Sequence, residues 1–193
     1  QLIQHFQLDK DKAPQHYAIG FKEIWDVPVE KHHAGLVVHS AGWPLTEASG
    51  GGYLYHTEGQ QVVVGLIVDL NYSNPYLNPF EEFQRYKQHP VIRRYLKDGK
   101  RVAYGARAIA KGGLNSLPKM SFNGGMLLGC NAGTLNFAKI KGNHTAMKSG
   151  MLAAETVAKA LLAGDTGGQD LTDFATHFAN SWLNDELYRS RNF

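Results

Sequence analysis

The segment Gln61-Val62-Val63-Val64-Gly65-Leu66-Ile67-Val68 is apolar at almost every position and rich in β-branched residues. A run that is apolar on both faces predicts a strand in the middle of a sheet. Upstream lies a second β-rich run, Tyr53-Leu54-Tyr55-His56, and the turn residues Glu58-Gly59 separate the two. Two such runs joined by a glycine-containing turn predict a β-hairpin. We therefore expect a sheet built around this hairpin.

Further strands are expected on both sides of the hairpin. They occupy residues 18–25, 35–39, 101–107 and 125–130. The first helix is expected to begin at the cap residue Asn78 and to end at His89-Pro90, because proline disfavours helical backbone in the residue before it. A second, short helix is expected over residues 91–96.

Two longer helices are expected near the end of the chain. One runs from about residue 144 to residue 163, and its apolar side is formed by Met147, Met151, Ala154, Ala158 and Leu161. The other starts near Asp170 and carries Leu171, Phe174, Phe178 and Trp182 on one side. Because strands dominate the first two thirds and helices the last third, we expect an α+β fold with a mixed or mainly antiparallel sheet and flanking helices.

Composition excludes several classes of protein. The chain has 193 residues, 43% of them hydrophobic, which is enough to build a core. Its net charge of +3 is small and dispersed, which argues against nucleic-acid binding. The apolar runs fall well short of the roughly 20 residues that a membrane-crossing helix needs. The single cysteine, Cys130, rules out an internal disulfide or a cysteine-ligated iron–sulfur cluster within the chain, and we expect it to be packed rather than reactive.

Motifs of several enzyme classes are missing. The nine histidines show no HxxxH or HExxH spacing, so scattered histidines are a better interpretation than a metal site. No serine lies in a GxSxG context, and no GxGxxG follows a candidate strand near the start. Hydrolase chemistry and a complete dinucleotide-binding fold are therefore disfavoured.

The segment 124–147 has the composition of a cofactor-binding corner. An apolar strand enters a glycine- and asparagine-rich loop, and a helix opens at Gly142 to Thr145. The first N–H groups of a helix are unpaired and carry partial positive charge, so they stabilise negative charge on a phosphate or a reduced flavin. An ordinary strand–loop–helix corner, whose glycines only make turns, stays open as the alternative.

A second glycine-rich segment is Ser49-Gly50-Gly51-Gly52, which follows Gly42-Trp43-Pro44-Leu45 closely. Consecutive glycines leave backbone N–H and C=O groups without steric cover, and aromatic neighbours could hold a flat ring that carries carbonyl oxygens. The alternative is a flexible loop or bulge, which composition alone favours.

These segments also carry a resemblance to a known family. The chain closely resembles the electron transfer flavoprotein–ubiquinone oxidoreductases over residues 16–192. The matching stretches are Gly42-Trp43-Pro44-Leu45, 51–56 (GGYLYH), 71–80 (NYSNPYLNPF), 82–85, 99–108, Pro118-Lys119, 139–142 (KIKG) and 144–150 (HTAMKSG).

The resemblance implies a function and a fold. Members of the family are peripheral inner-membrane flavoproteins, on the matrix side in mitochondria or on the bacterial cytoplasmic membrane. They pass electrons from reduced electron transfer flavoprotein, through FAD and a 4Fe–4S cluster, to ubiquinone. Their fold is similar to that of the aromatic hydroxylase and geranylgeranyl reductase flavoproteins. By this resemblance, residues 1–122 form most of the quinone-binding sheet domain, 123–164 a returning strand and helix of the FAD domain, and 165–193 a helix leading to the iron–sulfur domain.

The resemblance also implies binding residues. A Gly-Gly pair whose backbone contacts the quinone head aligns with Gly50 and Gly51. The residues implied for FAD are Asn115, Gly129, Asn131, Gly133, Thr134, Gly142 and Thr145. Cys130 stands where related flavoproteins carry an aspartate, so backbone contacts are expected to matter more there. No catalytic side chain and no metal ligand is implied.

The same comparison suggests what the chain lacks. We expect an internal portion of the enzyme without the dinucleotide fingerprint or the cluster cysteines, and therefore without a complete electron path. A related FAD oxidoreductase without a cluster, and an isolated module that binds quinone or lipid without activity, stay open as alternatives. An uncovered sheet edge or apolar helix face could also pair with a second copy.

Overall fold

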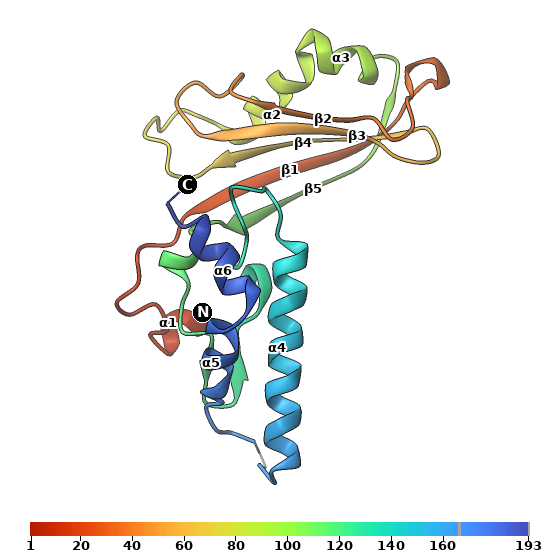
Figure 1. The fold of residues 1–193 in the computed structure, drawn as a ribbon. Helices are drawn as coiled ribbons and strands as arrows, with labels where there is room; N and C mark the ends of the chain where they lie inside the picture. Colours follow the sequence, from red (N-terminus) through yellow and green to blue (C-terminus); the bar gives the residue numbers. More distant parts are fainter. Residues whose placement is uncertain (166, 193) are drawn as a thin grey trace. The chain divides into compact units, whose positions relative to one another are not determined.

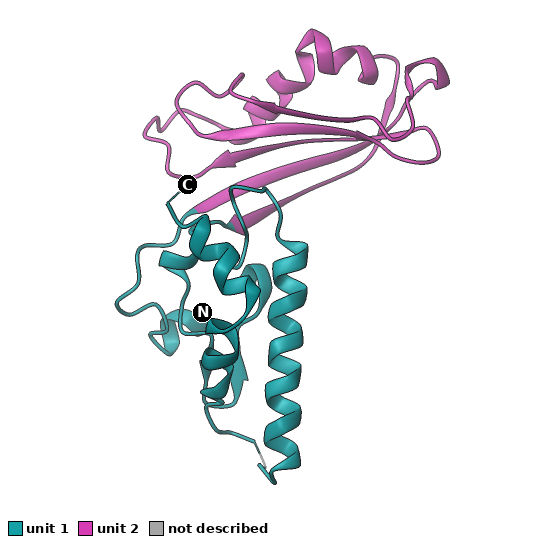
Figure 2. Ribbon diagram, viewed as in Figure 1, with its two compact units in different colours: residues 1–16, 110–193 teal, residues 17–109 magenta. Residues whose placement is uncertain are grey.

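A computed structural model describes residues 1–165 and 167–192. The chain forms two compact units, one of residues 17–109 and one of residues 1–16 with 110–193 (Figures 1 and 2). We call them the sheet unit and the helical unit. Residues 1–16 and 110–122 pack with the helical unit, whereas the expected functional division at residues 122 and 164 stays a prediction.

The sheet unit contains a five-stranded sheet with the strand order β2-β3-β4-β1-β5. Its strands are β1 (Tyr17–Asp26), β2 (Val37–Ala41), β3 (Gly50–His56), β4 (Gln61–Asp69) and β5 (Lys100–Ala110). The expected hairpin is confirmed as β3 and β4, which pair antiparallel with Leu54 opposite Val64. Strand β4 is the middle strand, as its continuous apolar sequence predicts.

Two helices cover one face of this sheet (Figure 1): α2 (Pro79–Gln88) and α3 (Pro90–Leu96). The expected start of α2 is confirmed, because the Asn78 carboxamide oxygen accepts a 3.0 Å hydrogen bond from the Phe80 N–H. Leu54, Val64 and Leu66 of the sheet and Phe83 and Tyr86 of α2 belong to one buried core. A 3-10 turn, η1 (Val29–Lys31), precedes β2.

A buried charge network ties α2 to the sheet. The Glu23 carboxylate, on β1, accepts hydrogen bonds of 3.0 and 2.8 Å from the Lys87 ammonium of α2. It also accepts a bond of 2.8 Å from the Trp25 indole N–H and one of 3.2 Å from Arg101 of β5. The side chains of Glu23 and Lys87 are only 2% and 9% exposed. All of their charge is therefore balanced inside the unit.

The helical unit holds the remaining elements. These are α1 (Leu2–His5), η2 (Leu114–Ser116), β6 (Ser121–Phe122), β7 (Gly125–Met126), η3 (Gly129–Asn131), α4 (Asn143–Leu162), α5 (Asp173–Ala179) and α6 (Trp182–Arg189). The strand expected over residues 125–130 is thus wrong beyond Met126, because the chain turns at Gly129, where φ is +59°.

Two expectations for the C-terminal helices are also wrong. The single last helix is divided, since Ser181 takes an extended conformation and its hydroxyl oxygen caps α6 by accepting from the Asn184 N–H. The long helix α4 is confirmed, but its expected apolar side faces outward: Met147 is 65% exposed and Leu161 is 61% exposed.

The buried side of α4 carries small and polar residues instead. They are Thr145, Ser149, Leu152, Ala153 and Thr156. Burial is tolerated because the hydroxyls bond to the helix itself: Ser149 donates to the Ala146 carbonyl at 2.7 Å and Thr156 to the Leu152 carbonyl at 2.8 Å.

Candidate functional site

The glycine-rich segment of the sheet unit is part of a strand, so the alternative of a flexible loop or bulge is wrong. Gly50 to Gly52 form the first three residues of β3. A Cβ atom on Gly50 would lie 2.1 Å from the Ile67 carbonyl oxygen, and one on Gly52 would lie 2.2 Å from the Tyr86 ring. Glycine is therefore required here by close packing of the strand against its neighbours.

The backbone N–H and C=O groups of Gly50 nevertheless lie beyond the last residue pair of β2 and β3. The N–H of His56 donates to the Leu36 carbonyl, so the even-numbered residues of β3 direct their backbone groups toward β2. In the described part of the chain, the register of β2 with β3 ends at Ala41 opposite Gly51, one residue short of Gly50. The Gly50 N–H and C=O consequently point past the last paired residue of β2, where a ligand could bond to them.

Next to this strand end, the face of the sheet opposite α2 and α3 is flat. One row across four strands consists of Ala41, Gly51, Ile67 and Gly20. We call this the flat row, and we call the face that contains it the open face. Three of its four residues have a methyl group or no side chain at all. The row therefore offers a surface on which a planar ring can lie.

Aromatic side chains border the flat row on the open face. Tyr53 and His39 are opposite each other in the next row, and Tyr55 follows in the row after it. The Tyr53 and Tyr55 rings stack with centroids 5.0 Å apart, and the Tyr55 hydroxyl lies 3.3 Å from the His39 Nε2. Burial, with a further contribution from Tyr55, raises the pKa of the Tyr53 hydroxyl. Sequence reasoning missed His39 and the tyrosines as a group, because their proximity depends on strand register.

The loop after β2 carries an exposed tryptophan. Trp43 is 45% exposed, and its ring lies 5.0 Å from the His89 ring. The neighbouring Leu45 is buried, and its Cδ1 lies 2.5 Å from where a Cβ on Gly50 would be. Because Leu45 packs against Gly50, the nearby Trp43 should change its fluorescence when a ligand binds at the Gly50 end of β3.

In the helical unit, the structure brings the expected cofactor loop together with the start of α4. The N–H groups of Gly133 and Thr134 donate to the Gly129 carbonyl at 3.1 and 3.2 Å, which closes a tight turn. The Gly129 N–H donates to the Ser149 hydroxyl of α4 at 3.0 Å. At Gly142, which caps the helix, a Cβ would lie 3.3 Å from the Cys130 sulfur. The turn therefore packs directly against the first two turns of α4.

The polar side chains among the residues expected to bind FAD differ in their exposure and in their hydrogen-bond partners. Asn131 is exposed, whereas Thr134 and Thr145 are fully buried. The Thr145 hydroxyl donates to the Gly142 carbonyl at 2.8 Å, but the Thr134 hydroxyl has no partner in the described structure. Asn115 lies in η2, and its side-chain amide donates to the Arg191 carbonyl at 3.4 Å.

A residue that sequence reasoning missed links these segments. The Gln15 side-chain oxygen accepts from the Gly112 N–H at 2.7 Å, and its amide nitrogen donates to the Ser116 carbonyl at 3.4 Å. The same nitrogen would lie 3.0 Å from a Cβ on Gly133, whose φ is +98°. Gln15 thereby holds the η2 segment beside the glycine turn.

A carboxylate stabilises the connection between the turn and α4. Glu186 accepts hydrogen bonds from Asn136 at 2.9 Å, from Lys139 at 2.8 Å and from His144 at 2.6 Å. Although partial burial opposes ionisation, these hydrogen bonds lower the pKa of Glu186 to about 2. The cluster joins residues that are 42 to 50 positions apart, so no local pattern could have revealed it.

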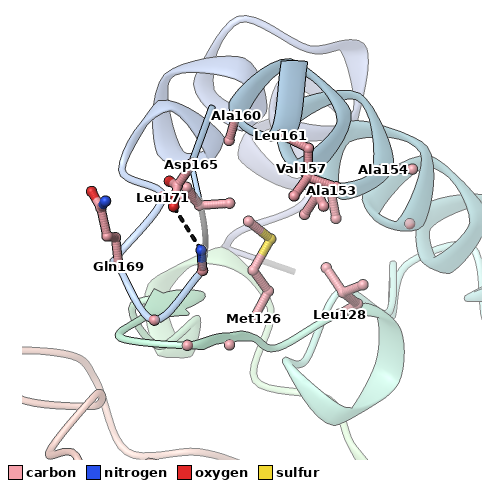
Figure 3. A pocket seen from close by; sticks show the side chains of 15 residues that line it. Met126, Leu128, Ala153, Ala154, Val157, Ala160, Leu161, Asp165, Gln169 and Leu171 are labelled. Atoms are coloured by element: carbon pink, nitrogen blue, oxygen red, sulfur yellow. Dashed lines mark hydrogen bonds between the residues drawn. The ribbon is translucent and has the colours of Figure 1, made fainter. Parts of the chain in front are cut away.

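The outward side of α4 lines an apolar groove of about 540 Å³ (Figure 3). Val157 and Leu161 of α4 face Met126 and Leu128 across it, and Leu171 closes one end. The groove contains few polar groups, so it offers packing surface and no evident chemistry.

Three further observations concern the expected chemistry. Cys130 is exposed, so the expectation of a packed thiol is wrong, because η3 turns it outward. Among residues 1–165 and 167–192, no three His, Cys, Asp or Glu side chains converge as a metal site. Within the same residues, no helix has the length and hydropathy to cross a membrane.

Comparisons with known proteins agree with this geometry. Residues 17–109 match the family described as "ETF-QO, ubiquinone-binding". The whole chain is 66% identical over 194 residues to electron transfer flavoprotein-ubiquinone oxidoreductase of Pseudomonas aeruginosa and covers 35% of that protein. It is 49% identical over 199 residues to the mitochondrial human protein of that name and covers 32% of it. The chain thus spans about a third of the length of these curated relatives.

Solved structures show the same fold at low sequence identity. A geranylgeranyl bacteriochlorophyll reductase-like protein from Thermoplasma acidophilum superposes with a TM-score of 0.70 at 16% identity, over 92% of this chain and 42% of the other. A flavin-dependent brominase gives a TM-score of 0.61 at 16% identity, over 94% of this chain and 46% of the other. The expected α+β fold, with its likeness to geranylgeranyl reductase-like flavoproteins, is confirmed.

Proposed function

Because residues 17–109 match the ubiquinone-binding family and the whole chain is 66% identical to part of an electron transfer flavoprotein-ubiquinone oxidoreductase, we propose that the chain belongs to that enzyme family and forms part of an enzyme that reduces ubiquinone. The electrons come from reduced electron transfer flavoprotein and pass through FAD and a 4Fe–4S cluster. The observation that carries the proposal is the end of β3, where the free backbone groups of Gly50 lie beside the flat row. This end lies inside the residues that match the ubiquinone-binding family.

This geometry supports a quinone site at the end of β3. A ubiquinone head is a flat ring with carbonyl oxygens on opposite sides. The Gly50 N–H donates to one carbonyl oxygen, and the ring rests on Ala41 and Gly51 of the flat row. Tyr53 limits how far the ring extends along the strands. A rigid sheet suits this task, because the position of the bound ring then depends little on side-chain motion.

The residues around the Gly129 turn fit FAD. A buried hydroxyl without a partner, on Thr134, and glycines at positive φ, at positions 129 and 133, are features of a turn that accommodates a polar ligand. FAD, when bound, exchanges electrons one at a time between the donor and the later acceptors. The N–H groups at the start of α4, after Gly142, would stabilise negative charge on the isoalloxazine ring of a bound FAD.

Each unit has a separate role in this proposal. The sheet unit supplies the quinone site, and the segment 123–164 of the helical unit supplies part of the FAD site. The segment after residue 164 leads toward the iron–sulfur domain of the longer protein. With a single cysteine, Cys130, this chain does not ligate the cluster by itself. We propose that the full-length protein binds peripherally to the inner or cytoplasmic membrane and that the isolated chain lacks quinone reductase activity.

The test uses the full-length protein with electron transfer flavoprotein as donor and a short-tail ubiquinone as acceptor. Ala41→Leu places a bulky side chain in the flat row without touching the packed glycines, and it should raise the KM for quinone by about tenfold or more through lost fit. Val37→Leu, on the same open face but outside the flat row, is the matched control and should leave the KM unchanged. FAD content and flavin reduction should be normal in both.

Two results would overturn the proposal. An unmodified protein that takes up electrons from the donor but does not reduce ubiquinone would exclude the assigned reaction. An Ala41→Leu protein with unchanged KM would exclude the flat row as the quinone site. As an independent readout, quinone should quench tryptophan fluorescence saturably in the isolated chain, and Trp43→Phe should remove most of that signal. Binding by the isolated chain without any quinone reduction by the full-length protein would favour the alternative of a module that only binds quinone or lipid.

A further inference from the structure

We propose that His39, oriented by Tyr55, is the catalytic acid that delivers a proton to the quinone as it is reduced. This inference rests on the proposed function, since it assumes a quinone bound at the flat row. It adds a proton-transfer residue to a site whose other groups are backbone and apolar surface.

The reaction requires such a residue. Reducing a quinone to a quinol adds two electrons and two protons, and a new O–H bond forms at each carbonyl oxygen. Reduced electron transfer flavoprotein, the donor in the proposed function, supplies the two electrons to the full-length enzyme. Without a proton source beside the ring, negative charge would accumulate on the oxygens in an apolar site, which is energetically costly. The His39 imidazolium gives one proton to the quinone oxygen nearer to it, becomes neutral and is then protonated again from water. The second proton reaches the oxygen at the Gly50 end from water.

The position of His39 meets this requirement. In the β2–β3 register, His39 is opposite Tyr53 and lies in the row next to the Ala41–Gly51 pair of the flat row. Rows on the same face of a strand are about 6.8 Å apart. A ring that is held at the Gly50 end and extends along the open face therefore approaches the imidazole. Because His39 is exposed, bulk water can reload it.

Tyr55 fixes the orientation of the imidazole. Its hydroxyl lies 3.3 Å from the His39 Nε2, and the two rings meet edge to face with centroids 5.5 Å apart. In the imidazolium, Nε2–H donates to the Tyr55 hydroxyl oxygen, which leaves Nδ1–H for the quinone. When Nδ1 gives up its proton, the neutral imidazole keeps its hydrogen on Nε2 and the bond to Tyr55 is unchanged. Tyr55 is thus a positioning residue and acts through His39.

Other titratable groups on the open face are poorer acids. Burial raises the pKa of Tyr53, so that hydroxyl keeps its proton. Lys22 is opposite Gly65 on the same face, but it is on β1, and strands β3 and β4 separate β1 from β2. His56 belongs to the opposite, helix-covered face, where it is buried. Among these groups only His39 is an exposed imidazole beside the flat row, and histidine is the side chain that most often serves as a general acid.

The experiment compares two acceptors in the full-length, FAD-containing protein. Ferricyanide takes an electron without a proton, whereas ubiquinone needs both. His39→Gln should lower kcat for ubiquinone by about a hundredfold or more, the usual effect of losing a general acid, and should leave ferricyanide reduction within about twofold of normal. Tyr55→Phe should lower quinone turnover about three- to tenfold, since it removes only orientation. Added imidazole should restore part of the His39→Gln activity, which a purely structural role would not allow. Quinone affinity, measured by tryptophan quenching, should stay within about threefold of normal.

The controls and the outcomes separate this inference from the proposed function. His16→Gln and Tyr104→Phe make the same chemical changes at exposed positions outside the site and should have no effect. Full quinone turnover in His39→Gln would overturn the inference and leave the proposed function intact. Equal losses with both acceptors would also overturn it, because the change would then act on folding or electron entry. An unmodified protein that reduces ferricyanide but never ubiquinone would overturn the proposed function itself.

Discussion

Replacing Glu23 by glutamine should destabilise the sheet unit strongly. The substitution keeps the size of the side chain but removes the negative charge that two cations share. Lys87, whose side chain is 9% exposed, would then be a buried ammonium without a counter-charge. Breaking a buried pair in this way costs about 3–5 kcal/mol. We expect about 3 kcal/mol, the lower end, because Arg101 is 46% exposed and can turn to water.

Urea unfolding followed by circular dichroism measures this loss. With a urea dependence of about 1–3 kcal/mol per molar, the midpoint for the sheet unit should fall by about 1–3 M. Glu82→Gln is the matched control, since it removes a carboxylate from α2 that pairs with Arg85 at 2.9 Å at the surface. It should cost only about 0.2–0.5 kcal/mol, as is usual for neighbouring ion pairs on a helix.

A double variant tests the reasoning further. Glu23→Leu combined with Lys87→Met replaces the pair by apolar side chains, and such exchanges are often neutral or stabilising. The double variant should therefore be more stable than either single variant. The argument would be refuted by a cost below about 1 kcal/mol for Glu23→Gln, or by a double variant whose loss equals the sum of the single losses.

Three more predictions follow from the structure. Burial lowers the pKa of His56 from its usual 6.5 to about 4, so the stability that its neutral form contributes is present above pH 6.5 and lost as the pH falls toward 4. The free energy of unfolding should fall by about 3 kcal/mol at most over this range, and His56→Gln should not show this fall in an acid titration. Hydrogen bonds lower the pKa of Glu186 to about 2, so below pH 4.5 the free energy of unfolding should decrease less steeply with falling pH in Glu186→Gln than in the unmodified chain. An unchanged acid transition would contradict the assigned contacts. The exposed apolar side of α4 should make the isolated chain self-associate at high concentration, and Met151→Glu with Leu161→Glu should yield monomers by light scattering; a monomeric unmodified chain would count against this.

Local patterns were sufficient where a segment determines its own structure. The β3–β4 hairpin and the Asn78 cap of α2 could both be predicted, because strand propensity, a glycine turn and a side-chain cap act over a few residues. The Gly129 turn and the start of α4 could be expected to meet for the same reason, since a short connection joins them.

Long-range packing decided what could not be predicted. Gly50 to Gly52 have the composition of a loop, but the Ile67 carbonyl and the Tyr86 ring approach so closely that only glycine fits in the strand. The burial of α4 could not be predicted from apolar spacing either, because its small hydroxyl residues satisfy their own polar groups and pack inside. Gln15 and Glu186 act on residues far away in the sequence, so no spacing rule identifies them.

The charge network and the proposed quinone site share one helix. Lys87 anchors α2 to Glu23, and on the preceding position of the same helix Tyr86 packs over Gly52 and lies 2.9 Å from the Ser40 hydroxyl. Ser40 and Gly52 are a pair in the β2–β3 ladder, next to the pair that ends it at Gly51. Anything that loosens α2 should therefore loosen the strand end that holds the free groups of Gly50. An apolar replacement for the buried pair that restores stability should also restore this strand end, because the site depends on the position of Tyr86 and has no need of the charges themselves.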